Sequence, residues 1–279
     1  MQTSITPTLR IKNKLISLQK PIVMGILNVT PDSFYEGSRI KTDKSILQKA
    51  SQMLEEGATI LDIGGYSTRP NADDISIEEE INRVVNPIRL IKKEFPNAII
   101  SIDTFRSKVA RQAVEAGADL INDVSGGSLD IQMFETVASL NVPYILMHMR
   151  GNPQTMKTLT NYENIITEMM TYFQQRITTL KSFGVEEIIL DLGFGFAKTI
   201  DQNYFLLKNL AVFEQLEFPI LAGISRKSMI YKQLAIPVSE ALNGTTVLNT
   251  IAIQNGAKIL RVHDVKEAME TIQLLSYLK

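Results

Sequence analysis

A six-residue phrase recurs along the chain and constrains its fold more than any other feature. It consists of glycine, alanine, one variable residue, two branched aliphatic residues and a polar residue, and it stands at 57–62 (GATILD), 117–122 (GADLIN) and 256–261 (GAKILR). Glycine suits the left-handed position that closes a helix, and the aliphatic pair suits a strand buried on both faces. Each copy therefore predicts a helix end, a buried strand and a polar strand end. A looser fourth copy runs from Gly184 to Asp191.

Four more strands are predicted where a proline precedes a short aliphatic run, since a proline is tolerated at the entry of a strand. These prolines are Pro21, Pro96, Pro143 and Pro219. The segments between strands carry aliphatic residues at helical spacing, for example over 46–54 and 77–91. A capping box formed by Ser76 and Glu79 is expected to begin the second of these helices.

Eight alternating units of strand and helix in 279 residues predict an α/β fold, a single-domain (β/α)8 TIM barrel. A doubly wound open sheet is the alternative. The predicted barrel occupies residues 21–279. Residues 1–20 do not fit the repeat, and we expect them to form an N-terminal extension, a short strand or hairpin that closes the barrel floor.

The composition excludes several classes of protein and site. The chain has no cysteine, which excludes disulfides, a thiolate nucleophile and cysteine-ligated metals. Its net charge is −1, from 29 basic and 30 acidic residues, so it has no general attraction for nucleic acid or an anionic membrane. Residues 1–20 lack the continuous apolar core of a signal peptide, and no later run is long enough to span a membrane, so we expect neither a leader nor a membrane segment. We therefore expect a cytoplasmic protein without nucleic-acid or membrane partners.

Polar residues gather at the predicted strand ends, where a TIM barrel carries its active site. These residues are Asn28, Asp62, Asp103, Asn122, Asp123, His148, Asp191, Ser225, Arg226, Lys227, Arg261 and His263. Any one of them can be a helix cap. Together, carboxylates, amides and cations on one rim can bind a ligand that is both a polar heterocycle and an anion.

The character of these groups indicates the chemistry. Asp103, Asn122 and Asp191 offer acceptors for the ring N–H and amino groups of a heterocycle, and the cations of the last two strands offer donors to phosphate oxygens. No Ser-His-Asp order is recognisable. Transfer between two bound substrates is therefore favoured over covalent catalysis.

Eight phrases, in order, resemble those of dihydropteroate synthases. They are MGILNVTPDSF (24–34), GGYSTRP (64–70), SIDT (101–104), IND (121–123), MHMRGNP (147–153), DLGFGFAK (191–198), SRKS (225–228) and RVHDV (261–265). One glycine-rich phrase alone would be a weak signal, but eight in order are specific. The resemblance covers the chain from about Pro21 to its C-terminus.

The resemblance implies condensation of 6-hydroxymethyl-7,8-dihydropterin pyrophosphate with p-aminobenzoate, which gives 7,8-dihydropteroate and pyrophosphate in folate biosynthesis. It also implies a single-domain barrel, a homodimer and a requirement for Mg²⁺. Two small-molecule substrates are the expected partners.

Roles carry over from the family position by position. The residues implied to bind the pterin pyrophosphate are Thr68, Asp103, Asn122, Met147, Asp191, Lys227, Arg261 and His263, of which Asp103, Lys227, Arg261 and His263 are the implied catalytic residues. Pro70, Phe196 and Ser228 are implied to bind p-aminobenzoate, and Asn28 to position Mg²⁺.

We expect a dissociative substitution, in which the pterin CH₂–O bond breaks before the aniline nitrogen attacks. The loops at 30–39 and 67–74 are expected to close over the bound anion. Many family members carry glutamate at Tyr66, proline at Leu192 and glycine at Ala197. The turn from Gly193 to Lys198 lacks an insertion of the kind found in sulfonamide-resistant relatives, so we expect a sulfonamide to mimic p-aminobenzoate.

Two alternatives remain open at this stage. Methyltransferases that use methyltetrahydrofolate share the pterin-binding barrel, but they would not need the phrases around Thr68, Lys227 and Arg261, whose donors suit pyrophosphate. A pterin-binding paralogue without activity is the second alternative. A missing carboxylate or cation at the rim would indicate it, and none is missing.

Overall fold

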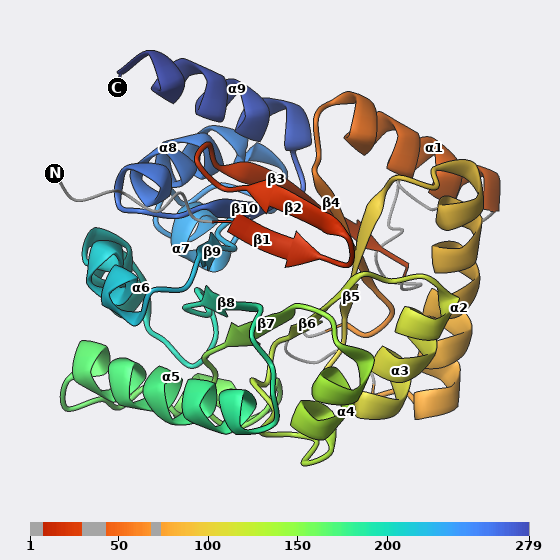
Figure 1. The fold of residues 1–279 in the computed structure, drawn as a ribbon. Helices are drawn as coiled ribbons and strands as arrows, with labels where there is room; N and C mark the ends of the chain where they lie inside the picture. The colour runs from red at the N-terminus through yellow and green to blue at the C-terminus, as the bar shows by residue number, and fades with distance from the viewer. Residues whose placement is uncertain (1–7, 30–42, 68–73, 279) are drawn as a thin grey trace, which may run out of the picture.

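The structure is a computed structural model that describes residues 8–29, 43–67 and 74–278. Eight parallel strands form a closed barrel in which β10 (Ile259–Val262) pairs with both β3 (Ile22–Asn28) and β9 (Ile220–Ala222). The helices surround the strands (Figure 1). The prediction of a (β/α)8 TIM barrel is therefore confirmed, and the open-sheet alternative is wrong.

The eight strands predicted from the sequence all form. The remaining barrel strands are β4 (Ile60–Gly64), β5 (Ile99–Asp103), β6 (Leu120–Asp123), β7 (Tyr144–Met147) and β8 (Ile188–Asp191). The α-helices described are α1 (Asp43–Glu55), α2 (Ile77–Glu94), α3 (Ser107–Ala116), α4 (Met133–Leu140), α5 (Ile165–Ser182), α6 (Ile200–Lys208), α7 (Ser228–Tyr231), α8 (Leu242–Gln254) and α9 (Val265–Leu275). Short 3-10 helices are η2 (Met156–Thr158), η3 (Leu210–Leu216), η4 (Val238–Glu240) and η5 (Ser276–Leu278).

Two local predictions need correction. The second strand was expected to end at Asp62, but β4 continues to Gly64, so Asp62 lies inside the strand. The expected capping box of α2 is only half formed. Ser76 Oγ accepts from the Glu79 amide at 3.1 Å, whereas the Glu79 carboxylate binds Arg83.

The alternation of the strands gives the barrel interior an apolar floor and, above it, a layer of polar side chains that we call the polar pocket. Buried aliphatic residues that face inward, such as Ile60, Leu120 and Ile189, form one cluster. Because every second residue of a strand points to the same side, the next inward residues are polar. They include Asp62, Asn122 and Asp191. The register places Asn28, Gly64, Asp103 and Asn122 in one row across β3 to β6.

An N-terminal hairpin closes the floor, as expected from the sequence. Strands β1 (Thr8–Ile11) and β2 (Lys14–Ser17) pair antiparallel and lie across the near end of the barrel in Figure 1. Leu9, Ile11 and Leu18 are buried against the apolar floor. Lys12 adds an ion pair to Asp119 at 2.6 Å. The division of the chain at residue 20 into extension and barrel stays a prediction.

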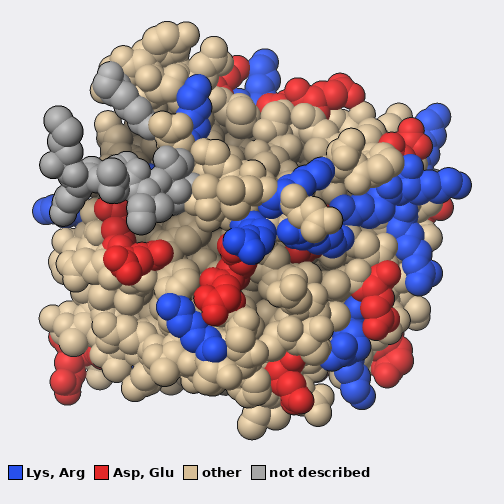
Figure 2. All heavy atoms as spheres, viewed as in Figure 1, with Lys and Arg blue, Asp and Glu red and all other residues tan. Residues whose placement is uncertain are grey.

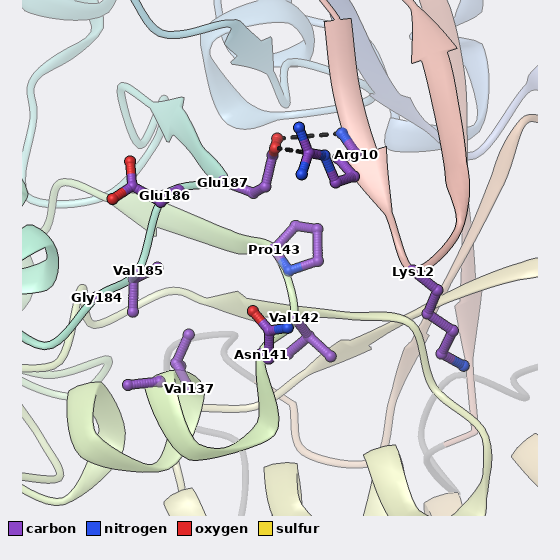
Figure 3. A pocket seen from close by; sticks show the side chains of 11 residues that line it. Arg10, Lys12, Val137, Asn141, Val142, Pro143, Gly184, Val185, Glu186 and Glu187 are labelled. Atoms are coloured by element: carbon purple, nitrogen blue, oxygen red, sulfur yellow. Dashed lines mark hydrogen bonds and ion pairs between the residues drawn. The ribbon is translucent and has the colours of Figure 1, made fainter.

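A small cavity lies beside the hairpin, at the end of the barrel opposite the polar pocket. Its volume is about 80 Å³, well below the roughly 300 Å³ from which ligand pockets start. Arg10 and Glu187 both line it and lie side by side, joined by a hydrogen bond of 3.1 Å from the Arg10 amide to the Glu187 carboxylate (Figure 3). This end of the barrel is therefore structural.

Figure 2 shows Lys and Arg interspersed with Asp and Glu over the face that carries the hairpin. Among the described residues, no helix has the length and apolarity needed to cross a membrane.

Candidate active site

Arg261 joins two buried carboxylates at the centre of the polar pocket. Its Nε donates to Asp62 Oδ2 at 2.6 Å and its Nη2 donates to Asp103 Oδ2 at 2.6 Å. Asn122 Nδ2 donates to the same Asp62 oxygen at 3.1 Å. Asp62 is fully buried, and its Oδ1 has no hydrogen-bond partner in the described part of the chain. An unpaired buried acceptor is costly, and it is expected where a bound molecule completes the site.

Asp191 and Lys227 lie next to this network, around Gly223. A Cβ atom added to Gly223 would lie 3.7 Å from Asp191 Oδ2, 3.8 Å from Lys227 Nζ and 3.9 Å from Arg261 Cβ. Lys227 Nζ donates to the Phe194 carbonyl at 2.5 Å. The glycine therefore leaves space between three charged side chains, from β8, from the loop after β9 and from β10.

Burial shifts the pKa values of these groups toward neutrality. It raises the pKa of Asp103 to about 7, although the Arg261 charge opposes this shift. Burial also raises the pKa of Asp191, against the opposing charge of Lys227. It lowers the pKa of Lys227 to about 8, against the opposing charge of Asp191. Buried groups that titrate near neutral pH are typical of active sites.

His263 lies on the same rim and is oriented by Ser225. The His263 amide donates to Ser225 Oγ at 3.2 Å, and that oxygen lies 3.0 Å from His263 Nδ1. These two contacts fix the orientation of the imidazole ring at the rim.

Asn28 and Asp103 flank Gly64 in the row that crosses β3, β4 and β5. A Cβ atom at Gly64 would lie 3.5 Å from Asn28 Oδ1 and 3.5 Å from Asp103 Cβ. The Asn28 amide has no hydrogen-bond partner among the described residues. An amide oxygen of this kind is available to a ligand or a cation.

The residues expected near p-aminobenzoate are only partly described. Met147 lies in a small apolar cluster against which Phe196 packs, and the Phe196 ring centroid lies 4.8 Å from Lys227 Nζ. Ser228 begins the one-turn helix α7 and directly follows Lys227. Thr68, Pro70 and the loop at 30–39 lie outside the described residues, as does all of the 67–74 loop except its two end residues.

Three residues that the sequence placed on the rim face away from the pocket. His148 follows inward-facing Met147, so it points outward, and its ring packs at 4.9 Å against Tyr172. Asp123 follows the inward-facing Asn122, so it also points outward. It accepts a hydrogen bond from the Tyr144 hydroxyl at 2.7 Å. The guanidinium of Arg226 forms a bidentate ion pair with Asp264. These three side chains serve packing and turn geometry.

Sequence reasoning also missed two contributions. Asp62 was noted at a strand end but was given no role, although it is the partner of Arg261. Lys198 was read only as part of the DLGFGFAK phrase, yet it is almost fully buried. A lysine inside a run of glycine and aromatic residues was the available signal.

Comparison with known proteins agrees with this geometry. A family described as pterin binding enzyme matches residues 24–263. A dihydropteroate synthase of Haemophilus influenzae is 44% identical over 265 residues, which cover 94% of this chain and 95% of that protein. The Escherichia coli dihydropteroate synthase is 42% identical over 262 residues, which cover 93% and 92% of the two chains.

Solved structures superpose over almost the whole chain. A Yersinia pestis dihydropteroate synthase in complex with a sulfonamide drug gives a TM-score of 0.93 at 38% identity and covers 98% of this chain and 99% of that one. A Xanthomonas albilineans dihydropteroate synthase with 4-aminobenzoic acid gives 0.90 at 35% identity and covers 98% of each chain.

The closed barrel and its buried pocket of carboxylates and cations define a pterin-binding enzyme. Within that class, the chain belongs to the dihydropteroate synthase family.

Proposed function

We propose that the chain catalyses the condensation of 6-hydroxymethyl-7,8-dihydropterin pyrophosphate with p-aminobenzoate. The products are 7,8-dihydropteroate and pyrophosphate. The observation that carries the proposal is the buried Asp62–Arg261–Asp103 network, which stands beside Asp191 and Lys227 in a barrel of this family. Family membership also favours the synthase over a folate-dependent methyltransferase.

The pterin lies inside the barrel above the apolar floor. Asp103 and Asp191 accept from its ring N–H and amino groups, and Lys227 donates to its ring carbonyl. The Nδ2 of Asn122 is engaged by Asp62, which leaves the amide oxygen of Asn122 as a further acceptor. Met147 packs against the ring. The polar assignments use hydrogen-bonding capacity that these side chains do not spend on one another.

The pyrophosphate group lies at the rim, where Arg261 and His263 donate to it together with Thr68. Asn28 fits a role as a ligand of Mg²⁺, because its amide oxygen has no other partner among the described residues. Magnesium is usually held by one or two protein oxygens and by substrate phosphates. When bound, the ion neutralises charge on the leaving pyrophosphate.

The p-aminobenzoate lies farther out, between Phe196 and Pro70, with its carboxylate near Ser228. Helix α7 is a single turn, so its macrodipole adds little, and the Ser228 hydroxyl and the Lys227 charge are the main attractions for the carboxylate. Related dihydropteroate synthases have been solved with a sulfonamide drug and with 4-aminobenzoic acid, and a sulfonamide is expected to compete here.

The reaction proceeds by dissociative substitution. The pterin CH₂–O bond breaks, its electron pair leaves with the pyrophosphate, and Arg261 and His263 stabilise the negative charge. Asp103 as a carboxylate stabilises the positive charge that develops on the pterin. The aniline nitrogen then forms the C–N bond and loses one proton to the departing pyrophosphate. No nucleophile of the enzyme takes part.

Three further proposals concern the protein as a whole. The chain forms a homodimer, and measured mass in solution should be twice its 31.2 kDa. It is cytoplasmic, without nucleic-acid or membrane partners. Pyrophosphate and Mg²⁺ should protect the segments at 30–39 and 67–74 from proteolysis.

The Asp103→Asn variant tests the function and its mechanism together. It keeps the size of the side chain but removes the charge, so kcat should fall by about 100-fold or more, while the thermal unfolding temperature changes little. Glu186→Gln is the control, because Glu186 is exposed beside the cavity at the opposite end of the barrel and should keep full activity. Full activity of Asp103→Asn would refute the role given to Asp103.

A further inference from the structure

Lys198 is a buried cation that the reaction does not use. Lys198 is 8% exposed. No carboxylate of the described chain lies within ion-pair distance of its amine. Its Nζ donates to the carbonyls of Gly193 at 3.1 Å and Phe196 at 3.0 Å, and it lies 3.0 Å from His148 Nδ1. Burial lowers the pKa of Lys198 to about 7. A buried amine with neutral partners costs free energy, so a gain elsewhere is expected to offset it.

The segment that Lys198 binds, residues 193–197, has an unfavourable backbone conformation. Gly193, Gly195 and Ala197 have φ values of 66°, 83° and 48°, all in the left-handed region. Ala197 is strained there, since a side chain disfavours this conformation. Phe196 lies between two of these residues. Its orientation therefore depends on hydrogen bonds that fix the carbonyls around it.

His148 provides the fixed end of this arrangement. Burial lowers the pKa of His148 well below its usual value, and the charge of Lys198 acts in the same direction. The imidazole is therefore neutral, and its Nδ1 can accept from the Lys198 amine. Tyr172 and Phe173 pack against the ring and hold it at the end of β7. Lys198 thus ties the 193–197 segment to a rigid strand end.

We propose that Lys198 is a positioning residue for the p-aminobenzoate site, since it holds the Gly193 and Phe196 carbonyls so that the Phe196 ring faces Lys227. This inference rests on the proposed function, which places p-aminobenzoate against Phe196. The ring centroid lies 4.8 Å from Lys227 Nζ, so a change in the segment displaces both the aromatic surface and its cation.

Loss of the amine should therefore affect one substrate selectively. Lys198→Met keeps an unbranched side chain of similar length but leaves the two carbonyls without their donor. The pterin groups Asp103 and Asn122 lie on β5 and β6, away from the segment. Asp191 and Lys227 bond to the segment at the Gly193 amide and the Phe194 carbonyl, and Lys198 binds neither of these two groups. A purely structural role would instead lower the amount of folded enzyme and leave both KM values unchanged.

The experiment measures steady-state kinetics and hydrogen exchange of the 193–198 amides in the full chain. In Lys198→Met, KM for p-aminobenzoate should rise about 10-fold or more, with a change of less than about 2-fold in KM for the pterin pyrophosphate. Exchange protection of the segment should fall about 10-fold. Lys208→Met is the matched control, because Lys208 is exposed at the far end of α6 and should change neither quantity.

A chemical rescue separates the amine from the shape of the side chain. The chain has no cysteine, so Lys198→Cys introduces a single thiol. When it is alkylated with 2-bromoethylamine in denaturant and refolded, the thiolate displaces bromide and a lysine-like ammonium results. This product should recover the parent KM for p-aminobenzoate.

The two readouts distinguish the possible failures. Unchanged exchange and an unchanged KM for p-aminobenzoate in Lys198→Met would overturn the proposal. A parallel rise in both KM values would also overturn it. If the parent chain has no synthase activity, the proposed function fails, and hydrogen exchange alone decides whether Lys198 fixes the segment.

Discussion

Replacement of Arg261 by methionine removes the charge that joins Asp62 and Asp103. Arg261 binds both carboxylates at 2.6 Å, and Asp62 is fully buried. A unit charge pair at about 4 Å is worth about 4 kcal/mol at an effective dielectric constant of 20, and breaking a buried pair typically costs about 3–5 kcal/mol. We therefore expect Arg261→Met to lower the free energy of unfolding by about 3–5 kcal/mol at about pH 8.

The loss of free energy of unfolding caused by Arg261→Met should decrease as the pH falls. Burial already raises the pKa of Asp103 to about 7, and Arg261 opposes that shift. Without Arg261 the pKa rises further, so the folded variant binds protons that the unfolded chain does not. The free energy of unfolding of Arg261→Met then increases as pH falls toward the pKa of Asp103 in the unfolded chain. It decreases as pH rises through the pKa of Asp103 in the folded variant. Each unit of added shift is worth about 1.4 kcal/mol.

Urea denaturation of four proteins checks this reasoning: the parent, Arg261→Met, Asp103→Asn and the double variant. In the Asp103→Asn background only one carboxylate is left unpaired, so Arg261→Met should cost about 1–3 kcal/mol less than in the parent. A cost below about 1 kcal/mol in the parent at about pH 8 would contradict the account. The account would also be contradicted if the destabilisation by Arg261→Met were the same at every pH, or the same in the parent and in Asp103→Asn.

Three other changes probe single parts of the site. The ammonium of Lys227, with its pKa of about 8, should be lost as pH rises, so KM for the pterin pyrophosphate should increase above about pH 8 in the parent and not in Lys227→Arg. Phe196→Ala should raise KM for p-aminobenzoate about 10-fold, as measured by steady-state kinetics; an equal effect on both substrates would count against its placement. Asn28→Ala should raise the Mg²⁺ concentration for half-maximal activity about 10-fold or more, and a magnesium titration that matches the parent would remove Asn28 from the metal site.

Periodicity was enough to predict the barrel and its pocket. The Gly-Ala phrases and the proline-led strands place polar residues at strand ends, and closure of the barrel brings Asp103, Asn122, Asp191 and Arg261 together inside it. The direction of each side chain was harder to predict, because it depends on alternation within the strand. His148 was expected on the rim, but it follows an inward residue and therefore points outward.

Pairing between distant residues could not be predicted. Asp62 and Arg261 are 199 positions apart, and only the closed barrel brings them to 2.6 Å. The position of Lys198 in a run of glycine and aromatic residues was a signal of its burial, but its partners could not be predicted, since they are mainly backbone carbonyls that depend on the left-handed turn around Phe196. Contacts of this kind arise from the folded backbone and not from any local pattern.

The central claim is tested most directly by the stoichiometry of turnover. The purified chain is supplied with the dihydropterin pyrophosphate, p-aminobenzoate and Mg²⁺, and pyrophosphate and 7,8-dihydropteroate are measured together. We expect the two products in equal amounts, with much slower pyrophosphate release when p-aminobenzoate is omitted. Binding of the pterin without any dihydropteroate would contradict the claim and identify a pterin-binding protein without synthase activity.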